Sequence, residues 1–172
     1  AVSTTLKATS AIAKAAAIND STEFHGVKAT ATATVADMGA ITAANFTPTD
    51  NMVINGETVI GISTQIDDAD GSLVDAINSL TDKTGVVASI DSDNSLLLTA
   101  EDGRNIDVQI NGAAGPGVAP AGARVYRGGL TLQSEENIEI GAAGGAPGGA
   151  TQTNLLGDHG GGALTLGTNT QN

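Results

Sequence analysis

Two histidines are the first side chains in this 172-residue sequence to consider for zinc binding or proton transfer. His25 is followed by Gly26, and His159 lies in a glycine run directly after Asp158. A zinc hydrolase of the His-Glu-x-x-His type needs two histidines one helical turn apart and a glutamate base, and neither histidine has that context. His159 could serve a Ser-His-Asp triad, whose geometry no sequence reveals, but no Gly-x-Ser-x-Gly motif accompanies it. We therefore expect no catalytic residues and no enzymatic activity.

An acidic stretch at residues 66–72 has part of the pattern of a calcium-binding loop, because Asp68 and Asp70 alternate before Gly71. A complete loop supplies six or more oxygen ligands and ends in a bidentate glutamate at its twelfth position. Counted from Asp68, the twelfth position is Ser79. An acidic start to a helix, favoured by the helix dipole, explains the stretch better. We predict no metal site here.

The composition of the chain argues against several classes of partner. The formal net charge of −12, from 19 acidic and 7 basic residues, disfavours nucleic acid, whose phosphates must be neutralised by lysine and arginine. An anionic membrane surface would repel the chain for the same reason. Aromatic residues make up only 2 % of the chain, and the glycine run at 144–149 lacks the lysine of a phosphate-binding loop. We expect no nucleic-acid partner, no membrane partner and no cofactor.

The most informative feature of the sequence is an internal repeat. Residues 17–32, AINDSTEFHGVKATAT, and residues 76–91, AINSLTDKTGVVASID, align without a gap at an offset of 59. Both copies contain Ala-Ile-Asn, then Gly-Val, then Ala at matching positions. A catalytic site has no obvious use for such a duplication, whereas a protein that repeats a small packing unit does.

The second copy predicts a short helix. Apolar residues recur with the spacing of one helical face at Leu73, Ala76, Ile77 and Leu80. Asp70 or Ser72 can accept hydrogen bonds from the free N–H groups of the first turn. Gly85, after Thr84, can adopt the left-handed conformation that ends a helix. We expect the helix to end at this pair.

Strands are predicted after this helix and before it. Residues 86–90 and 95–100 have strand character and flank an acidic turn. Upstream, residues 51–62 give the strongest hairpin signal in the chain, because Asn55-Gly56 supplies the positive φ angles that a two-residue turn requires. The second copy is therefore expected to be a helix followed by a hairpin.

The first copy predicts the same order of elements. Ser10 is a plausible N-cap for an alanine-rich helix at residues 11–19, and Gly26 closes the helical segment. Residues 27–35 alternate as one strand. The residues expected to form helix-on-sheet cores are Leu73, Ile77, Leu80 and Val86, with Ile12, Ile18 and Val27 as their counterparts.

The last third of the chain contains a weaker internal similarity. The pair of segments 96–99 and 105–108 resembles the pair 130–132 and 137–140, each reading as strand, acidic turn and strand. A final edge strand is expected at residues 163–167. The predicted fold class is α+β, mainly antiparallel β hairpins with two short helices packed on the sheets.

We expect two parts in the chain. Residues 1–110 would form a duplicated helix-hairpin domain, and residues 111–172 a Gly/Ala-rich β-hairpin extension packed on the first part. The chain starts without methionine or a signal-peptide pattern, so we expect it to be an internal piece of a longer protein.

In combination, these motifs resemble the central, variable region of bacterial flagellin. The similarity is carried by the Ala-Ile-Asn…Gly-Val…Ala unit, by VINGETVIGI at residues 53–62 and by LLLTAEDGRNIDVQI at residues 96–110. The resemblance implies a structural, surface-exposed outer domain of a secreted filament subunit that supports motility. In that family, long terminal helices, which have no counterpart here, polymerise into the filament.

The same resemblance sets the expected partners. It implies other flagellin subunits, contacted mainly through helices absent from this sequence, and host receptors or antibodies at the filament surface. Hook-associated proteins share the repeated element. A domain of such a protein, or of another bacterial surface protein with an adhesive or glycan-binding role, is the alternative.

Overall fold

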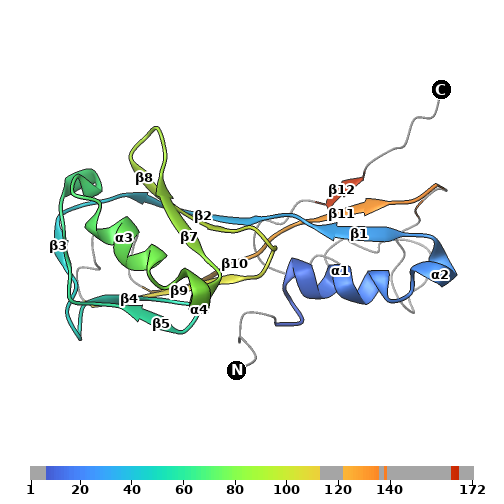
Figure 1. Ribbon diagram of the computed structural model, residues 1–172, viewed down its shortest axis with the longest axis horizontal. Coiled ribbons are helices and arrows are strands. Elements are labelled where there is room, and N and C mark those ends of the chain that lie inside the picture. The colour runs from blue at the N-terminus through green and yellow to red at the C-terminus, as the bar shows by residue number, and fades with distance from the viewer. Residues whose placement is uncertain (1–6, 113–121, 136–137, 139–163, 167–172) are drawn as a thin grey trace.

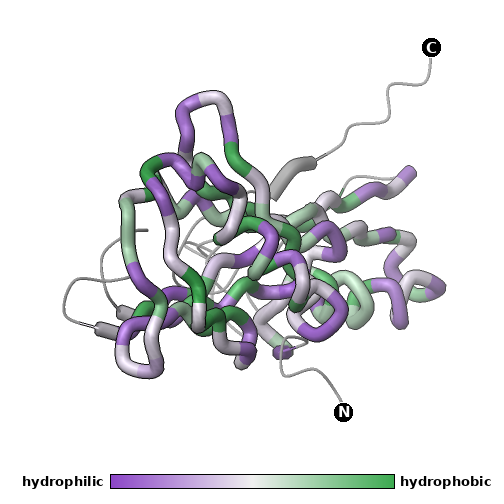
Figure 2. Tube along the Cα trace, turned by 60° about the vertical axis from the view of Figure 1, so that its left-hand side comes forward, coloured by the Kyte–Doolittle hydropathy of each residue, from purple (hydrophilic) through white to green (hydrophobic). Residues whose placement is uncertain are grey.

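The computed structural model describes residues 7–112, 122–135, 138 and 164–166, and it arranges them in two lobes that lie end to end (Figure 1). The small lobe contains residues 7–31, 130–135, 138 and 164–166, and the large lobe contains residues 34–112 and 122–126. Residues 32–33 and 127–129 link the two lobes. Each lobe holds one copy of the repeat. Coloured by hydropathy, the chain shows hydrophilic stretches at many of the turns that project from the lobes (Figure 2).

The small lobe is one three-stranded sheet with a helix on one face (Figure 1). Its helices are α1 (Ala11–Asn19) and α2 (Thr22–His25). Its strands, in spatial order, are β1 (Lys28–Ala31), β11 (Leu130–Gln133) and β12 (Leu164–Leu166). The β1–β11 pair is antiparallel and the β11–β12 pair is parallel.

The large lobe holds the second copy and the remaining sheets. Its helices are the 3-10 turn η1 (Ile66–Asp68), α3 (Ser72–Asn78) and α4 (Thr81–Thr84). A three-stranded antiparallel sheet has the order β2 (Thr34–Ala40), β8 (Ser95–Ala100) and β7 (Val87–Ile90). A four-stranded antiparallel sheet has the order β10 (Gly122–Tyr126), β9 (Ile106–Asn111), β4 (Asn51–Ile54) and β5 (Glu57–Val59). A short pair joins β3 (Ala44–Asn45) to β6 (Ser63–Thr64).

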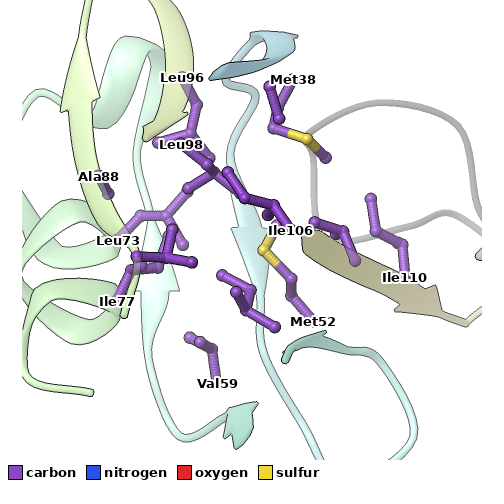
Figure 3. Close-up of a cluster of buried hydrophobic side chains, with 14 of the residues drawn as sticks. Met38, Met52, Val59, Leu73, Ile77, Ala88, Leu96, Leu98, Ile106 and Ile110 are labelled. Carbon is purple, nitrogen blue, oxygen red and sulfur yellow. The ribbon is translucent and has the colours of Figure 1, made fainter. Parts of the chain in front are cut away.

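The main hydrophobic core lies inside the large lobe (Figure 3). Leu73 and Ile77 of α3 are fully buried, and they pack with alternate residues from the strands of both larger sheets. Strand β8 shows the alternation: Leu96 and Leu98 are buried, whereas Leu97 between them is half-buried. This is the period-2 pattern of a strand that faces a core on one side.

A second core is confined to the small lobe. It consists of small residues on α1 and larger ones on β11, namely Ala11, Ala15, Ala29, Leu130 and Leu132. The alanines let α1 approach the sheet closely, which suits a chain that has few aromatic residues to fill a gap.

Several predicted elements are confirmed. The helix at residues 11–19, its N-cap Ser10 and the strand at residues 95–100 have the expected bounds. Asn55 and Gly56 have φ values of 49° and 90°, as the tight turn between β4 and β5 requires. The fold class is α+β, built mainly from antiparallel strands, with α1 and α3 as the longer helices.

The prediction of one strand over residues 27–35 was wrong. The segment divides into β1 and β2, which belong to different sheets in different lobes. Ala29 is buried in the small core, whereas Thr34 and Ala36 are buried in the large lobe. Between the two strands, the N–H of Thr32 donates to the carbonyl of Gly129, the residue just before β11, at 2.9 Å.

The predicted core was correct in the second copy and shifted in the first. Leu73, Ile77 and Val86 are fully buried. In α1 the buried positions are Ala11 and Ala15, while the predicted Ile12 is only half-buried. Leu80, Ile18 and Val27 pack against their cores from partly buried positions.

The last third is described only in part. The expected edge strand near the C-terminus is β12, which lies at the edge of its sheet. The predicted strand at residues 137–140 lies outside the described residues except for Ile138, which contacts the small core. The division of the chain at residue 110 stays a prediction, and β10 and β11, which follow it, pair with strands that precede it.

Candidate functional site: a repeated helix–strand clamp

The repeated Ile-Asn pair places an asparagine against the strand that follows it in both lobes. In the small lobe, Asn19 Nδ2 donates to Ala29 O at 2.8 Å, and Ala29 N–H donates to Asn19 Oδ1 at 2.7 Å. In the large lobe, Asn78 Nδ2 donates to Ala88 O at 3.1 Å, and Ala88 N–H donates to Asn78 Oδ1 at 2.7 Å. Each asparagine thus satisfies both backbone groups of one buried alanine. We call the segment from Asn19 to Ala29 the first clamp and the segment from Asn78 to Ala88 the second clamp.

The position of these alanines explains why the bonds matter. Strands β1 and β7 are edge strands of their sheets, so one side of each has no neighbouring strand. An edge strand presents N–H and C=O groups that can pair with another chain. The asparagine amide, with a donor and an acceptor in one plane, occupies this edge as a further peptide group would.

A threonine and a glycine complete the clamp in both copies. Thr22 Oγ1 donates to Val27 O at 3.0 Å, and Thr81 Oγ1 donates to Val86 O at 2.9 Å. The N–H groups of Gly26 and Gly85 donate to Thr22 O and Thr81 O, and both glycines are left-handed, with φ values of 67° and 68°. This left-handed glycine ends the helix and turns the chain into the strand.

His25, the first histidine considered for chemistry, has a backbone role in the clamp. Its Nδ1 accepts the N–H of Val27 at 3.0 Å. Its counterpart in the second copy is Thr84, whose Oγ1 accepts the N–H of Val86 at 3.1 Å. Two unlike side chains therefore supply the same acceptor at the same point of the repeat. The other histidine, His159, lies outside the described residues.

The two copies differ at the position before this acceptor. Phe24 is 90 % exposed, whereas its counterpart Lys83 forms an ion pair with Glu57 across 3.3 Å. Glu57 belongs to β5, so this ion pair ties the end of the second copy to the β4–β5 hairpin. The Lys83 side chain is 64 % exposed and that of Glu57 36 %, and an ion pair this open to solvent contributes little to stability.

The acidic residues considered as calcium ligands begin α3. Asp68 is buried, and its two carboxylate oxygens accept the N–H groups of Leu73 at 2.9 Å and Val74 at 3.0 Å. Asp70 Oδ1 accepts the N–H of Ser72 at 3.2 Å, and this hydrogen bond lowers the pKa of Asp70. Among the described residues, no group of three or more potential ligands lies close enough to hold a metal ion.

The helix cap was therefore predicted only in part. Asp70 accepts an N–H of the first turn as expected. The Ser72 hydroxyl is used elsewhere: it donates to Ser63 O at 3.0 Å. Asp68 supplies most of the cap from the preceding 3-10 turn, and a helix-start pattern does not reach back that far.

The acidic surplus is concentrated in the large lobe. Residues 34–112 contain 13 acidic and 2 basic side chains. This part of the surface would repel phosphate groups, and it favours solubility. No helix in the described residues is both long and apolar enough to cross a membrane.

Comparison with known proteins connects this architecture to a family. Residues 51–102 match the family model described as the flagellin hook IN motif. The matched range begins with β4 and runs past β8, so it contains the second clamp in full. The chain therefore has a recognised flagellin unit as one of its two clamps.

The curated relatives agree with this match. Flagellin A of Helicobacter felis is 35 % identical over 107 residues, which are 60 % of this chain and 20 % of the relative. Flagellin A of Helicobacter mustelae is 33 % identical over 123 residues, or 69 % of this chain and 24 % of the relative. Flagellin B of Helicobacter pylori is 50 % identical over 48 residues, or 28 % and 9 %. The chain therefore carries a flagellin motif and is similar to bacterial flagellins, and it matches about a fifth to a quarter of the length of the first two relatives.

Proposed function

We propose that this chain is a surface-exposed outer domain of a flagellin, and that its role in the extracellular flagellar filament is structural. The observation that carries the proposal is the coincidence of the flagellin hook IN motif with the complete second clamp. The domain would project from the filament, whose subunits would assemble through parts of the protein other than this chain. We propose no enzymatic activity for it.

The clamp gives a physical reason for the repeat in such a setting. Identical domains along a filament face one another at high local concentration. Edge strands left open under these conditions would pair between neighbours. Because Asn19 and Asn78 cover the edges of β1 and β7 at Ala29 and Ala88, each lobe blocks one edge of its sheet at a point where a neighbour would otherwise add a strand.

Antibodies raised against the purified chain would test this proposal on cells that carry the parent gene. Gold-labelled antibody should decorate the flagellar filament along its whole length. Labelling restricted to the junction with the hook or to the filament tip would instead indicate a hook-associated protein. A parent gene without the codons for residues 7–133 should still produce filaments, and these should no longer be labelled. Loss of the filaments would contradict the outer-domain assignment.

A further inference from the structure

We propose that the loop at residues 101–105 locks the two copies of the repeat into one rigid body. The lobes are linked covalently by two short stretches, residues 32–33 and 127–129. Two such links alone would allow the lobes to bend. The loop between β8 and β9 adds contacts to both lobes at the same place, and this inference stands independently of the proposed function.

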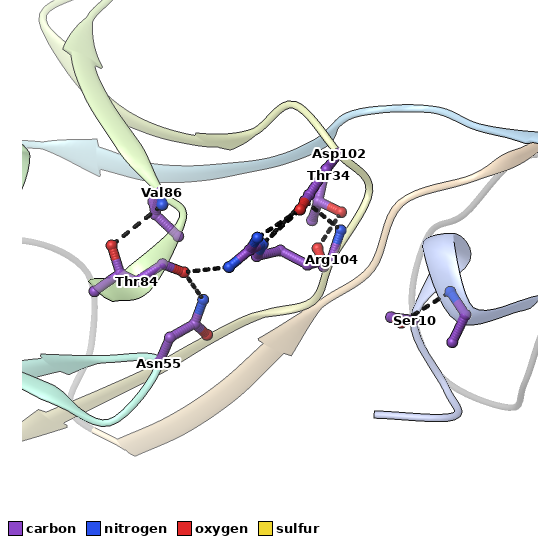
Figure 4. A network of polar contacts seen from close by, with 8 residues as sticks. Ser10, Thr34, Asn55, Thr84, Val86, Asp102 and Arg104 are labelled. Carbon is purple, nitrogen blue, oxygen red and sulfur yellow. Dashed lines mark hydrogen bonds and ion pairs between the residues drawn. The ribbon is translucent and has the colours of Figure 1, made fainter. Parts of the chain in front are cut away.

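The loop holds the second copy through Arg104. The Arg104 guanidinium forms an ion pair with Asp102 across 2.6 Å, and its Nη1 donates to Thr84 O at 3.4 Å (Figure 4). Asn55, from the β4–β5 turn, donates to the same carbonyl at 2.9 Å. The end of α4 is thereby joined to the loop and to the hairpin.

The same loop reaches the beginning of the first copy. Gly103 O accepts the N–H of Ile12 in the first turn of α1, at 3.4 Å. Asn105, which is buried, donates from Nδ2 to Thr9 Oγ1 at 3.0 Å. Just beyond the loop, Lys7 forms an ion pair with Asp107 across 3.2 Å. One five-residue segment therefore contacts the end of the second clamp and the start of α1, the helix that leads into the first.

Two glycines leave the junction no free space. A Cβ atom on Gly103 would lie 2.8 Å from Ala31 Cβ and 2.8 Å from Thr32 O, atoms of the small lobe and of the first link. A Cβ atom on Gly128, in the second link, would lie 2.5 Å from Thr32 O and 3.2 Å from Gly103 Cα. Real Cβ atoms do not approach backbone this closely, so the backbones of the loop and both links are in direct contact. Packed backbone of this kind does not deform continuously.

The distance between the lobes tests the lock directly. The chain has no cysteine, so Phe24→Cys and Ser92→Cys would place one spin label on each lobe, both at exposed sites. Pulsed electron paramagnetic resonance should give a single narrow distribution of distances between the two spin labels. Adding Gly103→Ala should broaden it at least twofold, because the added methyl group cannot fit between the lobes.

A matched glycine controls for backbone strain. Gly39 has a φ of 80°, close to the 75° of Gly103, but no atom lies within 4 Å of the position its Cβ would take. Gly39→Ala should therefore leave the distance distribution as narrow as in the labelled parent. The proposal is overturned if the parent distribution is already broad, or if Gly103→Ala leaves it as narrow as Gly39→Ala does.

Hydrogen exchange of the clamp amides gives a second test that does not depend on folding of Gly103→Ala. In lobes that open together, the N–H groups of Ala29 and Ala88 should be protected by the same factor. Gly39→Ala, which strains the large lobe alone, should then speed exchange of both amides equally, on the order of tenfold. Faster exchange of Ala88 with Ala29 unchanged would show two independent lobes and overturn the proposal.

Discussion

Asn78 and Ala88 are joined by two hydrogen bonds, in which the asparagine side chain both donates to and accepts from the alanine backbone, at 3.1 and 2.7 Å. Asn19 and Ala29 reproduce this relationship in the other lobe at 2.8 and 2.7 Å. Both alanines are 3 % exposed. The repeat therefore fixes a helix end to the edge of a strand.

Removing the amide should destabilise the large lobe. Asn78→Ala would leave the N–H and C=O of Ala88 without a partner, and a buried polar group left in this state costs about 1 to 3 kcal/mol. We expect the free energy of unfolding to fall by roughly 2 to 4 kcal/mol, measured by urea denaturation with circular dichroism. Asn19→Ala should cause a similar loss.

An exposed residue four positions after Asn78, in the next helix, provides the control. Asp82→Ala removes an exposed side chain from α4 and should change the free energy of unfolding by less than about 0.5 kcal/mol. Equal stability of Asn78→Ala and Asp82→Ala would show that the two hydrogen bonds at Ala88 do not hold the clamp.

The isoleucines before the two asparagines should differ in their contribution. Ile77 is fully buried in the large core, so Ile77→Ala should lower the free energy of unfolding by about 2 to 5 kcal/mol. Ile18 is only half-buried against the small core, so Ile18→Ala should cost less. Ile66, 66 % exposed, is the control, and Ile66→Ala should be nearly neutral. Thermal melts would rank the three, and a parent-like melt for Ile77→Ala would contradict the assigned core.

Local patterns in the sequence were sufficient for several elements but not for the clamp. Ser10 followed by a run of alanines specifies α1, and Asn55-Gly56 specifies its turn, because each signal acts within a few residues. The partner of Asn78 lies ten residues away, across a helix end and a turn. The signals in the sequence were the asparagine retained in both copies and, three residues after it, the retained Thr22 and Thr81, which no apolar face requires.

Tertiary contacts decided the remaining differences. Residues 27–35 alternate without a glycine or proline, so nothing local marks the passage from one sheet to another at residues 32–33. Likewise, Asp68 caps α3 from the preceding 3-10 turn, because the chain turns back between Ala69 and Gly71. Histidine is a residue type that can serve as a metal ligand or a base. His25 instead accepts a backbone N–H, as Thr84 does at the equivalent position of the second copy.

Acid should weaken the junction at Asp102. Burial raises the pKa of this carboxyl, but the hydrogen bonds and positive charge of Arg104 outweigh burial and hold the pKa below its usual value. A carboxyl whose folded pKa is depressed stabilises the protein above its unfolded pKa of about 3.9, and this contribution is lost as pH falls through the folded pKa. Asp102→Asn removes the contribution at every pH.

The measurement is urea denaturation of parent and Asp102→Asn from about pH 7 to about pH 2. The parent should be more stable at neutral pH, and the difference should shrink as pH falls below about 4. A difference that stays constant over the whole range would show that the charge of Asp102 contributes nothing and that only its shape matters.

A swap between the copies tests the role of His25. His25→Thr would supply a hydroxyl acceptor for the N–H of Val27, as Thr84 does for Val86, so its free energy of unfolding should stay within about 0.5 kcal/mol of the parent. His25→Val has nearly the shape of threonine but no acceptor, and it should cost about 0.5 to 1.5 kcal/mol, the net contribution of one hydrogen bond. Urea denaturation of the two variants side by side isolates that bond. Equal losses for both would mean that the imidazole itself, rather than its acceptor, is what the first copy requires.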